Sequence, residues 1–435
     1  MRSTAVAALG VTAILALSAC GGGSGSSTSD SPTTVPSTQG DGKTLTVWVM
    51  DGDYTDATLD AINTSFTKAT GAKVDIQIQQ WEGITTKIST ALSSKDTPDI
   101  LDLGNTQVPG FAANGGLLDL TPYRDDLKQG RTWLPGLEEP ATVDGSLYAV
   151  PGFAGARAVI YNKKTWAAAG VTKAPTTYAE LTAALDKVKA ANPAADFSPF
   201  YLPGQYWFAG MQWIWDAGGE IATKDGGTWK GGFSSAAAQK GLTGFKTFQN
   251  TYSTPASRTL DVLVPDQTQL FADGKTSAIL ATAGSIGLIQ KANPKITDLG
   301  TFPFPGTSGK SQPVMLGGSD WGIATKSDTP ELALQWTKIA GSPDIQDQYV
   351  FGKDGWIPNS TEAIKAAQTA GLTEQQEGFF AGALTSKATP AAAQWPTVEG
   401  DKSINQVFSA VVSGAKSPAD AAKDFDAHLG STLAS

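Results

Sequence analysis

The sequence is poor in the side chains that carry most hydrolytic and metal chemistry, because its 435 residues include one histidine and one cysteine. The single cysteine, Cys20, cannot form an internal disulfide or a cysteine-based metal site. The single histidine, His428, lies in a segment with helical spacing near the end of the chain and is interpreted as a solvated or capping residue. Serine–histidine–aspartate triads and histidine metal centres are therefore disfavoured, and we expect no metal and no cofactor.

Basic clusters and long apolar runs are also absent from most of the chain. The net charge is −9, which argues against binding to nucleic acid. The only long apolar run covers residues 5–19 behind Arg2, and it is too short to span a bilayer as a helix. Residues 1–19 are therefore predicted to be a secretory signal peptide.

The end of this signal resembles a bacterial lipobox, Leu17-Ser18-Ala19-Cys20. In that interpretation Cys20 becomes the first mature residue and carries a lipid that holds the protein at the extracytoplasmic face of the cell membrane. Residues 20–42 follow, rich in Gly, Ser, Thr and Pro and without apolar periodicity. We expect this segment to be a flexible tether.

The chain from Lys43 is too long for one hydrophobic core and predicts two lobes. Apolar residues alternate with period two over 43–50 and 72–81, a third strand is expected over 98–105, and helices are expected over 56–71 and 82–96. This β-α-β-α-β order favours an α/β lobe with a mostly parallel sheet. Further helices are expected at 177–192, 329–342 and 417–433, and further strands at 277–284 and 296–306.

Four passages resemble the extracellular solute-binding proteins of bacterial ABC importers, in their carbohydrate-binding branch. They are "STALSSKDTPDILDLGNTQVPGFAANGGLLDLTPY", "LYAVPGFAGARAVIYNKKTWAAAGVTKAPTTYAEL", "FADGKTSAIL" and "GGSDWGIATKSDTPELALQWTKIAGSPDIQDQYVFGKDGWIPNS". The resemblance covers nearly the whole mature chain. It implies a two-lobed α/β fold like that of periplasmic binding proteins, with the ligand held in a cleft between lobes that close about a hinge.

The resemblance also implies the domain organisation and the partners. Crossovers near 150–158 and 311–321 would make both lobes discontinuous. We expect residues 43–153 plus 277–318 in lobe 1, and residues 154–276 plus 319–435 in lobe 2. The implied function is capture of a mono- or oligosaccharide, without chemistry on it, by a monomer that delivers it to a membrane permease with a cytoplasmic ATPase.

Candidate ligand contacts lie where strands end, at the crossovers, and at the aromatic cluster "QYWFAGMQWIWDAGG". Ligands of open α/β sheets gather at the carboxyl ends of strands, and aromatic faces suit the apolar C–H face of a pyranose. The expected ligand-binding residues are Asp53, Trp81, Glu82, Asn105, Arg157, Tyr206, Trp207, Asp320, Trp321 and Trp356.

Several of these residues could instead serve the fold. Asp53 could cap the next helix, and Arg157 could be an ion-pair partner at the hinge. Helical spacing places Trp207, Phe208, Met211, Ile214 and Trp215 on one stripe, which is typical of a core. We expect Trp321→Ala to weaken solute binding by about 2 kcal/mol.

Two other functions remain open from the sequence. The same architecture could bind a polyamine or a peptide, in which case a cationic solute would need several carboxylates in the cleft. A secreted carbohydrate-active enzyme with two carboxylates is also compatible with a total of 41 Asp and Glu residues. Many relatives place an aromatic residue after the strand at 277–284, whereas Ser285 and Ile286 follow it here.

Overall fold

The computed structural model describes residues 33–434. The predicted signal peptide, Cys20 with its predicted lipid and the first part of the predicted tether lie outside these residues. Within the described part of the chain, no helix is both long and apolar enough to cross a membrane.

The strands are β1 (Thr44–Met50), β2 (Lys73–Gln79), β3 (Ile100–Gly104), β4 (Thr142–Val143), β5 (Ser146–Leu147), β6 (Ala149–Gly155), β7 (Arg157–Asn162), β8 (Ala222–Asp225), β9 (Thr228–Gly231), β10 (Ala278–Thr282), β11 (Leu299–Phe302), β12 (Val314–Met315), β13 (Gly317–Ile323), β14 (Ile357–Pro358) and β15 (Ser386–Lys387). The α-helices are α1 (Asp56–Thr70), α2 (Ile84–Ser93), α3 (Val108–Ala113), α4 (Arg124–Lys128), α5 (Pro135–Ala141), α6 (Lys163–Ala168), α7 (Tyr178–Ala191), α8 (Trp207–Asp216), α9 (Ala236–Tyr252), α10 (Gln267–Ala272), α11 (Gly284–Ala292), α12 (Pro330–Ala340), α13 (Pro343–Ile345), α14 (Thr361–Ala370), α15 (Glu374–Ala383), α16 (Trp395–Gly400), α17 (Ser403–Ser413) and α18 (Pro418–Thr432). Shorter turns of other helix types are η1 (Asn105–Gln107), η2 (Thr121–Tyr123), η3 (Pro255–Thr259) and η4 (Gln346–Phe351).

The first lobe is built on a six-stranded sheet in the order β14-β6-β13-β3-β1-β2. Its first elements follow the predicted β-α-β-α-β order, and β1 pairs in parallel with both β2 and β3. Alternation in β1 buries Leu45, Val47 and Val49. Helix α1 buries Leu59, Ile62 and Phe66 on one face.

The expectation of a mostly parallel sheet holds for only part of this lobe. β13 pairs antiparallel with both β3 and β6, and β14 pairs antiparallel with β6. The reason is that β13 enters this sheet from the second lobe, and β14 follows it across α12 and α13 and so runs in the same direction. A returning strand has no helical crossover that forces it to run parallel.

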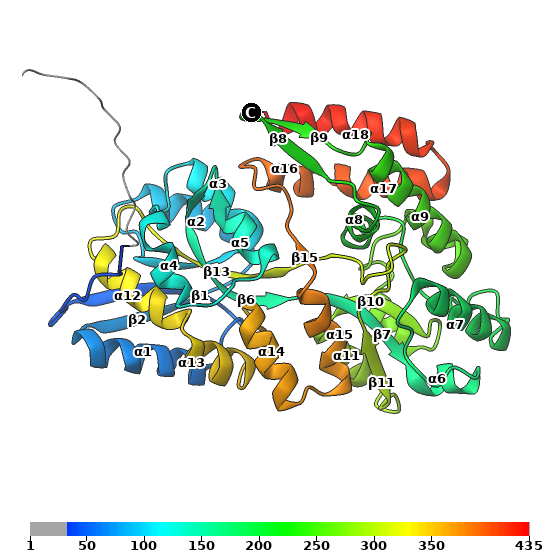
Figure 1. The fold of residues 1–435 in the computed structure, drawn as a ribbon, viewed down its shortest axis with the longest axis horizontal. Helices are drawn as coiled ribbons and strands as arrows, with labels where there is room; N and C mark the ends of the chain where they lie inside the picture. The colour runs from blue at the N-terminus through cyan, green and yellow to red at the C-terminus, as the bar shows by residue number, and fades with distance from the viewer. Residues whose placement is uncertain (1–32, 435) are drawn as a thin grey trace, which may run out of the picture. The chain divides into compact units, whose positions relative to one another are not determined.

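The second lobe contains a three-stranded antiparallel sheet in the order β10-β7-β11. Most of its core is helical, with α8 packed on α9 and with α17 and α18 nearby (Figure 1). Helix α7 begins with a capping box, in which Thr177 and Glu180 satisfy each other's backbone N–H groups. Helix α18 confirms the predicted last helix.

The sheets divide the chain differently from the expected lobe boundaries. The chain crosses at the β6–β7 junction and again before β13, close to the expected crossovers. However, β10 and β11, expected in lobe 1, join β7 in the second lobe, whereas β13 and β14, expected in lobe 2, join the first. Strand order along the chain does not specify strand partners, because pairing is decided by long-range packing.

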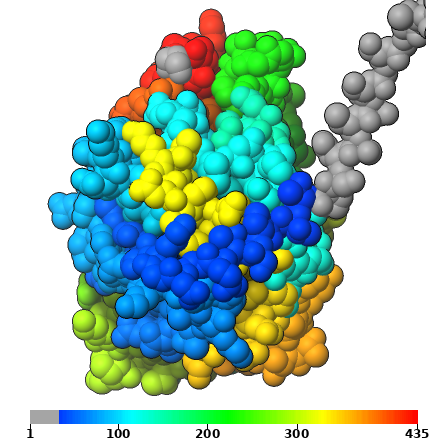
Figure 2. Space-filling view, turned by 90° about the vertical axis from the view of Figure 1, so that its left-hand side faces the viewer, coloured from blue at the N-terminus to red at the C-terminus, as the bar shows by residue number. Residues whose placement is uncertain are grey.

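The tether expectation also needs correction for residues 33–42. Val35 packs against the first-lobe core, and its backbone N–H donates to Asp126 Oδ2 at 2.7 Å. The Thr38 hydroxyl donates to Glu331 of α12 at 2.7 Å. Figure 2 shows the N-terminal residues, in dark blue, running over the surface of the first lobe. This end of the segment is therefore part of the folded lobe.

Candidate functional site

A cavity of about 350 Å³ brings together residues of both lobes at the ends of β3, β7, β10 and β13. Its lining combines aromatic rings, charged groups and glycine backbone. The lining residues are Asp53, Trp81, Gly104, Asn105, Thr106, Phe153, Gly155, Arg157, Phe208, Thr282, Met315, Gly317, Gly318, Trp356 and Glu399.

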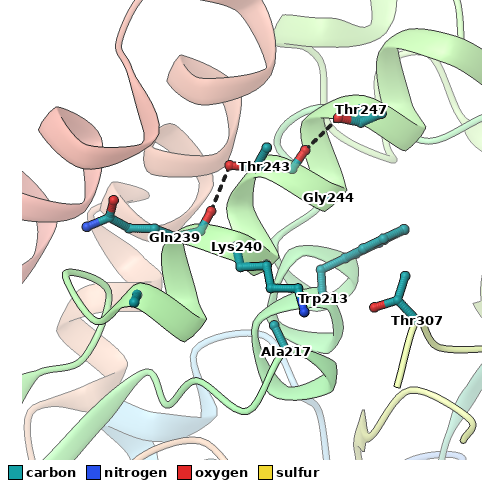
Figure 3. Close-up of a pocket in the computed structure, with 10 residues that line it drawn as sticks. Trp213, Ala217, Gln239, Lys240, Thr243, Gly244, Thr247 and Thr307 are labelled. Carbon is teal, nitrogen blue, oxygen red and sulfur yellow. Dashed lines mark hydrogen bonds between the residues drawn. The ribbon is translucent and has the colours of Figure 1, made fainter. Parts of the chain in front are cut away.

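A larger hollow of about 550 Å³ lies beside α8 and α9 and is drawn in Figure 3. Ala217, Gly241 and Gly244 line much of it, and no carboxylate does. The hydroxyls of Thr243 and Thr247 donate to carbonyls of their own helix, at 2.8 and 2.9 Å, rather than into the hollow. We therefore place the site in the cavity that both lobes line, where aromatic and charged groups converge.

The first lobe supplies the aromatic platforms. Trp81 follows β2 and is 41% exposed, unusually high for so large an apolar side chain. Trp356 stacks on Phe153 with ring centroids 4.5 Å apart and an interplanar angle of 12°. Because Phe153 covers one face of Trp356, the indole is held as a rigid wall of the cavity.

A loop-to-helix clamp fixes Trp356. Its Nε1 donates to the backbone oxygen of Asp53 at 2.7 Å. Two residues earlier, Asp354 Oδ1 accepts from the backbone N–H of Thr55, at 3.2 Å, and from the hydroxyls of Thr55 and Thr58, at 2.6 and 2.7 Å. Asp354 thus caps α1 from a distant part of the chain, where Thr55 makes no side-chain cap of its own.

The carboxyl of Asp53 lies in the same wall and is 8% exposed. Burial raises its pKa from 3.8 to about 6, opposed by a hydrogen bond from Trp81 Nε1 at 3.4 Å. Behind it, Asp102 is fully buried, accepts from the Met50 N–H at 3.0 Å, and also accepts from the Ser319 hydroxyl. Burial and the neighbouring charge of Asp53 raise the pKa of Asp102 as well.

The second lobe supplies the other polar groups. Arg157 begins β7, and its guanidinium carbon lies 3.5 Å from the ring centroid of Phe208. Arg157 Nε donates to the hydroxyl of Tyr206 at 3.0 Å. Glu399, in α16, accepts from Trp395 Nε1 at 2.6 Å, and burial raises its pKa.

Glycine is required where β13 passes the site. A Cβ added at Gly318 would lie 2.2 Å from the backbone oxygen of Phe153, so no larger residue fits that approach of β13 to β6. Gly317 and Gly318 both line the cavity. The backbone at these two glycines therefore forms part of the wall.

The structure gathers only some of the sequence-predicted site residues. Asp53, Trp81, Asn105, Arg157 and Trp356 line the cavity. Asn105 uses both N–H groups of its side chain structurally, donating to the backbone oxygens of Gly136 and Leu316 at 3.2 and 3.0 Å.

The other predicted residues lie elsewhere. Glu82 is exposed and outside the cavity lining. Tyr206 lies behind Arg157, and Trp207 is buried against Phe208 and Trp395. Helical spacing placed Trp215 in a core stripe, and it is 4% exposed; Trp213 lies outside that stripe and is nevertheless 3% exposed.

Trp321 and Asp320 are corrections to the prediction. Trp321 is 0% exposed and lies between Tyr54, at 5.0 Å, and Trp336, at 4.9 Å, between ring centroids. Asp320 is also 0% exposed, and neither of its carboxyl oxygens has a hydrogen-bond partner among the described residues. The crossover brings the glycines to the cavity, but from Ser319 onward both faces of β13 are covered, so the side chains of Asp320 and Trp321 are buried.

Sequence reasoning missed Phe153, Phe208, Thr282, Met315 and Glu399. Helical spacing places Phe208 in the core stripe, yet it lies in the first turn of α8 at the cavity. Thr282 had a usable signal, because it ends β10. Glu399 had none, because nothing local shows that α16 meets the first lobe near η1. No group of three His, Cys, Asp or Glu residues within 33–434 is placed to hold a metal ion.

Comparison with known proteins agrees with this architecture. Residues 61–375 match the family described as bacterial extracellular solute-binding protein. The chain is 34% identical over 440 residues to the diacetylchitobiose binding protein DasA of Streptomyces coelicolor, covering 100% of this chain and 99% of the relative. It is 25% identical to a maltooligosaccharide ABC transporter solute-binding lipoprotein of Streptococcus pneumoniae, covering 98% and 95% of the two chains.

Solved structures share the fold. The sugar-binding protein MalE of Xanthomonas citri matches with a TM-score of 0.76 at 22% identity, covering 90% of this chain and 98% of that chain. A cyclo/maltodextrin-binding protein complexed with maltotetraose matches with a TM-score of 0.74 at 19% identity, covering 90% and 97%. The two-lobed fold, the cavity that both lobes line and the family match over residues 61–375 lead to one conclusion: this chain belongs to the bacterial extracellular solute-binding protein family.

Proposed function

We propose that this protein is the substrate-binding subunit of an ABC importer for a short oligosaccharide, and that it performs no chemistry on its ligand. The observation that carries the proposal is the division of the cavity. Trp81 and Trp356 present aromatic faces from the first lobe, and Arg157 and Glu399 present polar groups from the second. A pyranose has an apolar C–H face and a rim of hydroxyls, so it needs both kinds of wall.

Diacetylchitobiose is the first solute to test. DasA is named for that sugar and aligns with this chain from end to end. The Streptococcus pneumoniae relative is named for maltooligosaccharides, and one of the similar structures holds maltotetraose, so α-linked glucans are the natural comparison. A disaccharide or trisaccharide is also compatible with a cavity of about 350 Å³.

We further propose that a lipid on Cys20 anchors the protein outside the cell membrane. In that position it would act as a monomer and deliver its ligand to a permease that works with a cytoplasmic ATPase. The lipobox supports the anchor, together with the description of the Streptococcus pneumoniae relative as a lipoprotein. Metabolic labelling with a fatty acid is expected to mark the mature protein, and Cys20→Ser should abolish the label and release the protein from the membrane.

The test of ligand class is a titration of the soluble chain from Gly21, which retains the packed residues 33–42. Tryptophan fluorescence and calorimetry would be recorded with diacetylchitobiose, cellobiose, maltose, maltotetraose, spermidine and a tripeptide. Saturable binding of one oligosaccharide, recovered unchanged by chromatography, is the expected result. Binding of spermidine or the tripeptide alone would overturn the sugar assignment.

The enzyme alternative is tested in the same samples. Asp53 and Glu399 both line the cavity, so a two-carboxylate hydrolase is the reaction to look for. A pure binding role would be refuted if the wild-type protein released monosaccharide and if both Asp53→Asn and Glu399→Gln abolished that release. We expect no product with any sugar of the panel.

A further inference from the structure

Arg157 is the one cation among the described residues that line the cavity. Within residues 33–434 its side chain donates one hydrogen bond, from Nε to Tyr206, and no carboxylate of that range forms an ion pair with it. This excludes the ion-pair role at the hinge that the sequence left open. The N–H groups of its two terminal nitrogens therefore have no acceptor from the described part of the protein.

The guanidinium is held in place although it lacks an ionic partner. One face lies over Phe208 at 3.5 Å, and Phe208 is itself backed by Trp207, with ring centroids 3.8 Å apart. The Tyr206 hydroxyl fixes Nε at 3.0 Å, and Thr282 pairs with Arg157 across β10 and β7. A side chain oriented by so many contacts loses little further freedom when it donates to a ligand.

The surroundings select the kind of acceptor that fits. Asp53 and Glu399 line the same cavity, so an anionic uronic acid would meet two carboxyl groups. A free ammonium group could pair with Asp53 or Glu399, but it carries the same charge as Arg157 and cannot accept a hydrogen bond from it. A neutral carbonyl oxygen avoids both repulsions and is a stronger acceptor than a hydroxyl. Met315 adds apolar surface to the same cavity, which suits a methyl group.

We propose that Arg157 is a specificity-determining residue that donates to the carbonyl oxygen of an acetamido group, so that the site selects N-acetylated amino sugars over plain hexoses. Tyr206 is then a positioning residue that orients Arg157. This inference rests on the proposed sugar-binding function and assigns the basis of its selectivity. A plain hexose offers only a hydroxyl at that position and leaves the guanidinium without its best partner.

The test uses three β-1,4-linked disaccharides that differ only at C2 of each ring. Cellobiose carries a hydroxyl there, chitobiose an ammonium group, and diacetylchitobiose an acetamido group. Calorimetry on the chain from Gly21 is expected to give a Kd for diacetylchitobiose at least about 100-fold lower than for the other two, the size expected when a placed donor loses its acceptor. Cellobiouronic acid serves as the anionic comparison.

The variants separate selectivity from folding. Arg157→Met keeps the length and the apolar stem, and we expect it to raise the Kd for diacetylchitobiose at least about tenfold and for cellobiose less than about threefold. Arg157→Lys keeps the charge without the planar fork and should restore only part of the selectivity. Tyr206→Phe should raise the Kd for diacetylchitobiose alone, with an unchanged unfolding temperature marking it as a positioning change.

The outcomes are distinct. Equal loss of both sugars in Arg157→Met, or a loss below about threefold for diacetylchitobiose, would overturn the assignment of Arg157. Tighter binding of cellobiouronic acid than of diacetylchitobiose would reassign the residue to a carboxylate. If wild-type protein binds none of the four sugars and no maltooligosaccharide, the proposed function itself fails.

Discussion

Replacing Trp81 by alanine is the sharpest test of the aromatic wall, because the side chain is both accessible and placed at the cavity. A tryptophan side chain offers about 250 Å² of surface, so its 41% exposure leaves about 100 Å² for a ligand to cover. At about 25 cal/mol per Å², covering half or all of it contributes about 1.2 to 2.5 kcal/mol. Trp81→Ala should therefore raise the Kd by roughly 8- to 70-fold.

The assay is isothermal calorimetry with the preferred sugar, accompanied by thermal unfolding. We expect little change in stability, because the side chain is exposed and its hydrogen bond to Asp53 is long, at 3.4 Å. Ile78→Ala is the matched control, since Ile78 is 53% exposed at the end of the same strand but does not line the cavity. A Kd within twofold of wild type in folded Trp81→Ala, or an equal loss in the control, would refute the reasoning.

Three further predictions concern buried groups. The pKa of Asp53 rises from 3.8 to about 6 on folding, so the free energy of unfolding should fall as pH rises through that interval. Asp53→Asn should reduce this fall by at most about 3 kcal/mol, measured by urea unfolding at low and neutral pH. Trp321→Ala should lower the free energy of unfolding by about 3 to 5 kcal/mol, as expected for a fully buried tryptophan, and should change the Kd of the folded protein less than Trp81→Ala does. A small loss of stability with a larger change in Kd would return Trp321 to the ligand site. Asp354→Ala should lower stability by about 1 to 2 kcal/mol in thermal unfolding, because it removes the cap of α1. Asp354→Asn keeps one acceptor and should lower stability less. Equal losses of stability in the two variants would show that charge rather than capping matters.

The two walls of the cavity differ in a way that bears on selectivity. In the second lobe no aromatic residue follows β10 directly, and Ser285 and Ile286 stand at the start of α11. The Phe208 ring is covered by Arg157 on one face and by Trp207 near the other. Stacking is therefore left to Trp81 and Trp356. The second lobe instead contributes an oriented cation, which favours recognition of a substituent over recognition of a ring face.

Local sequence patterns were sufficient for the elements that begin the first lobe. Alternation predicted β1, β2 and β3, helical spacing predicted α1 and α2, and Gly71 ended α1 with a φ of 74° as a left-handed cap. The resemblance supplied the two lobes and the approximate crossovers. The resemblance did not specify which strands pair. Residues 277–318, which contain β10 and β11, were therefore expected in lobe 1 and β13 in lobe 2, whereas β10 and β11 pair in the second lobe and β13 in the first.

The candidate site shows the same division. The sequence by itself shows that the chain has one histidine and one cysteine, that its first residues resemble a lipoprotein signal, and that tryptophans and carboxylates follow its predicted strands. It could not decide between neighbours such as Asp320, Trp321 and Gly318, because nothing local shows that both faces of β13 are covered beyond its first two residues. Only the tertiary structure brought Glu399 beside η1, left Arg157 without an ion pair to any carboxylate of residues 33–434 and clamped Trp356 through Asp354, because these arrangements depend on segments that are hundreds of residues apart or lie in different lobes.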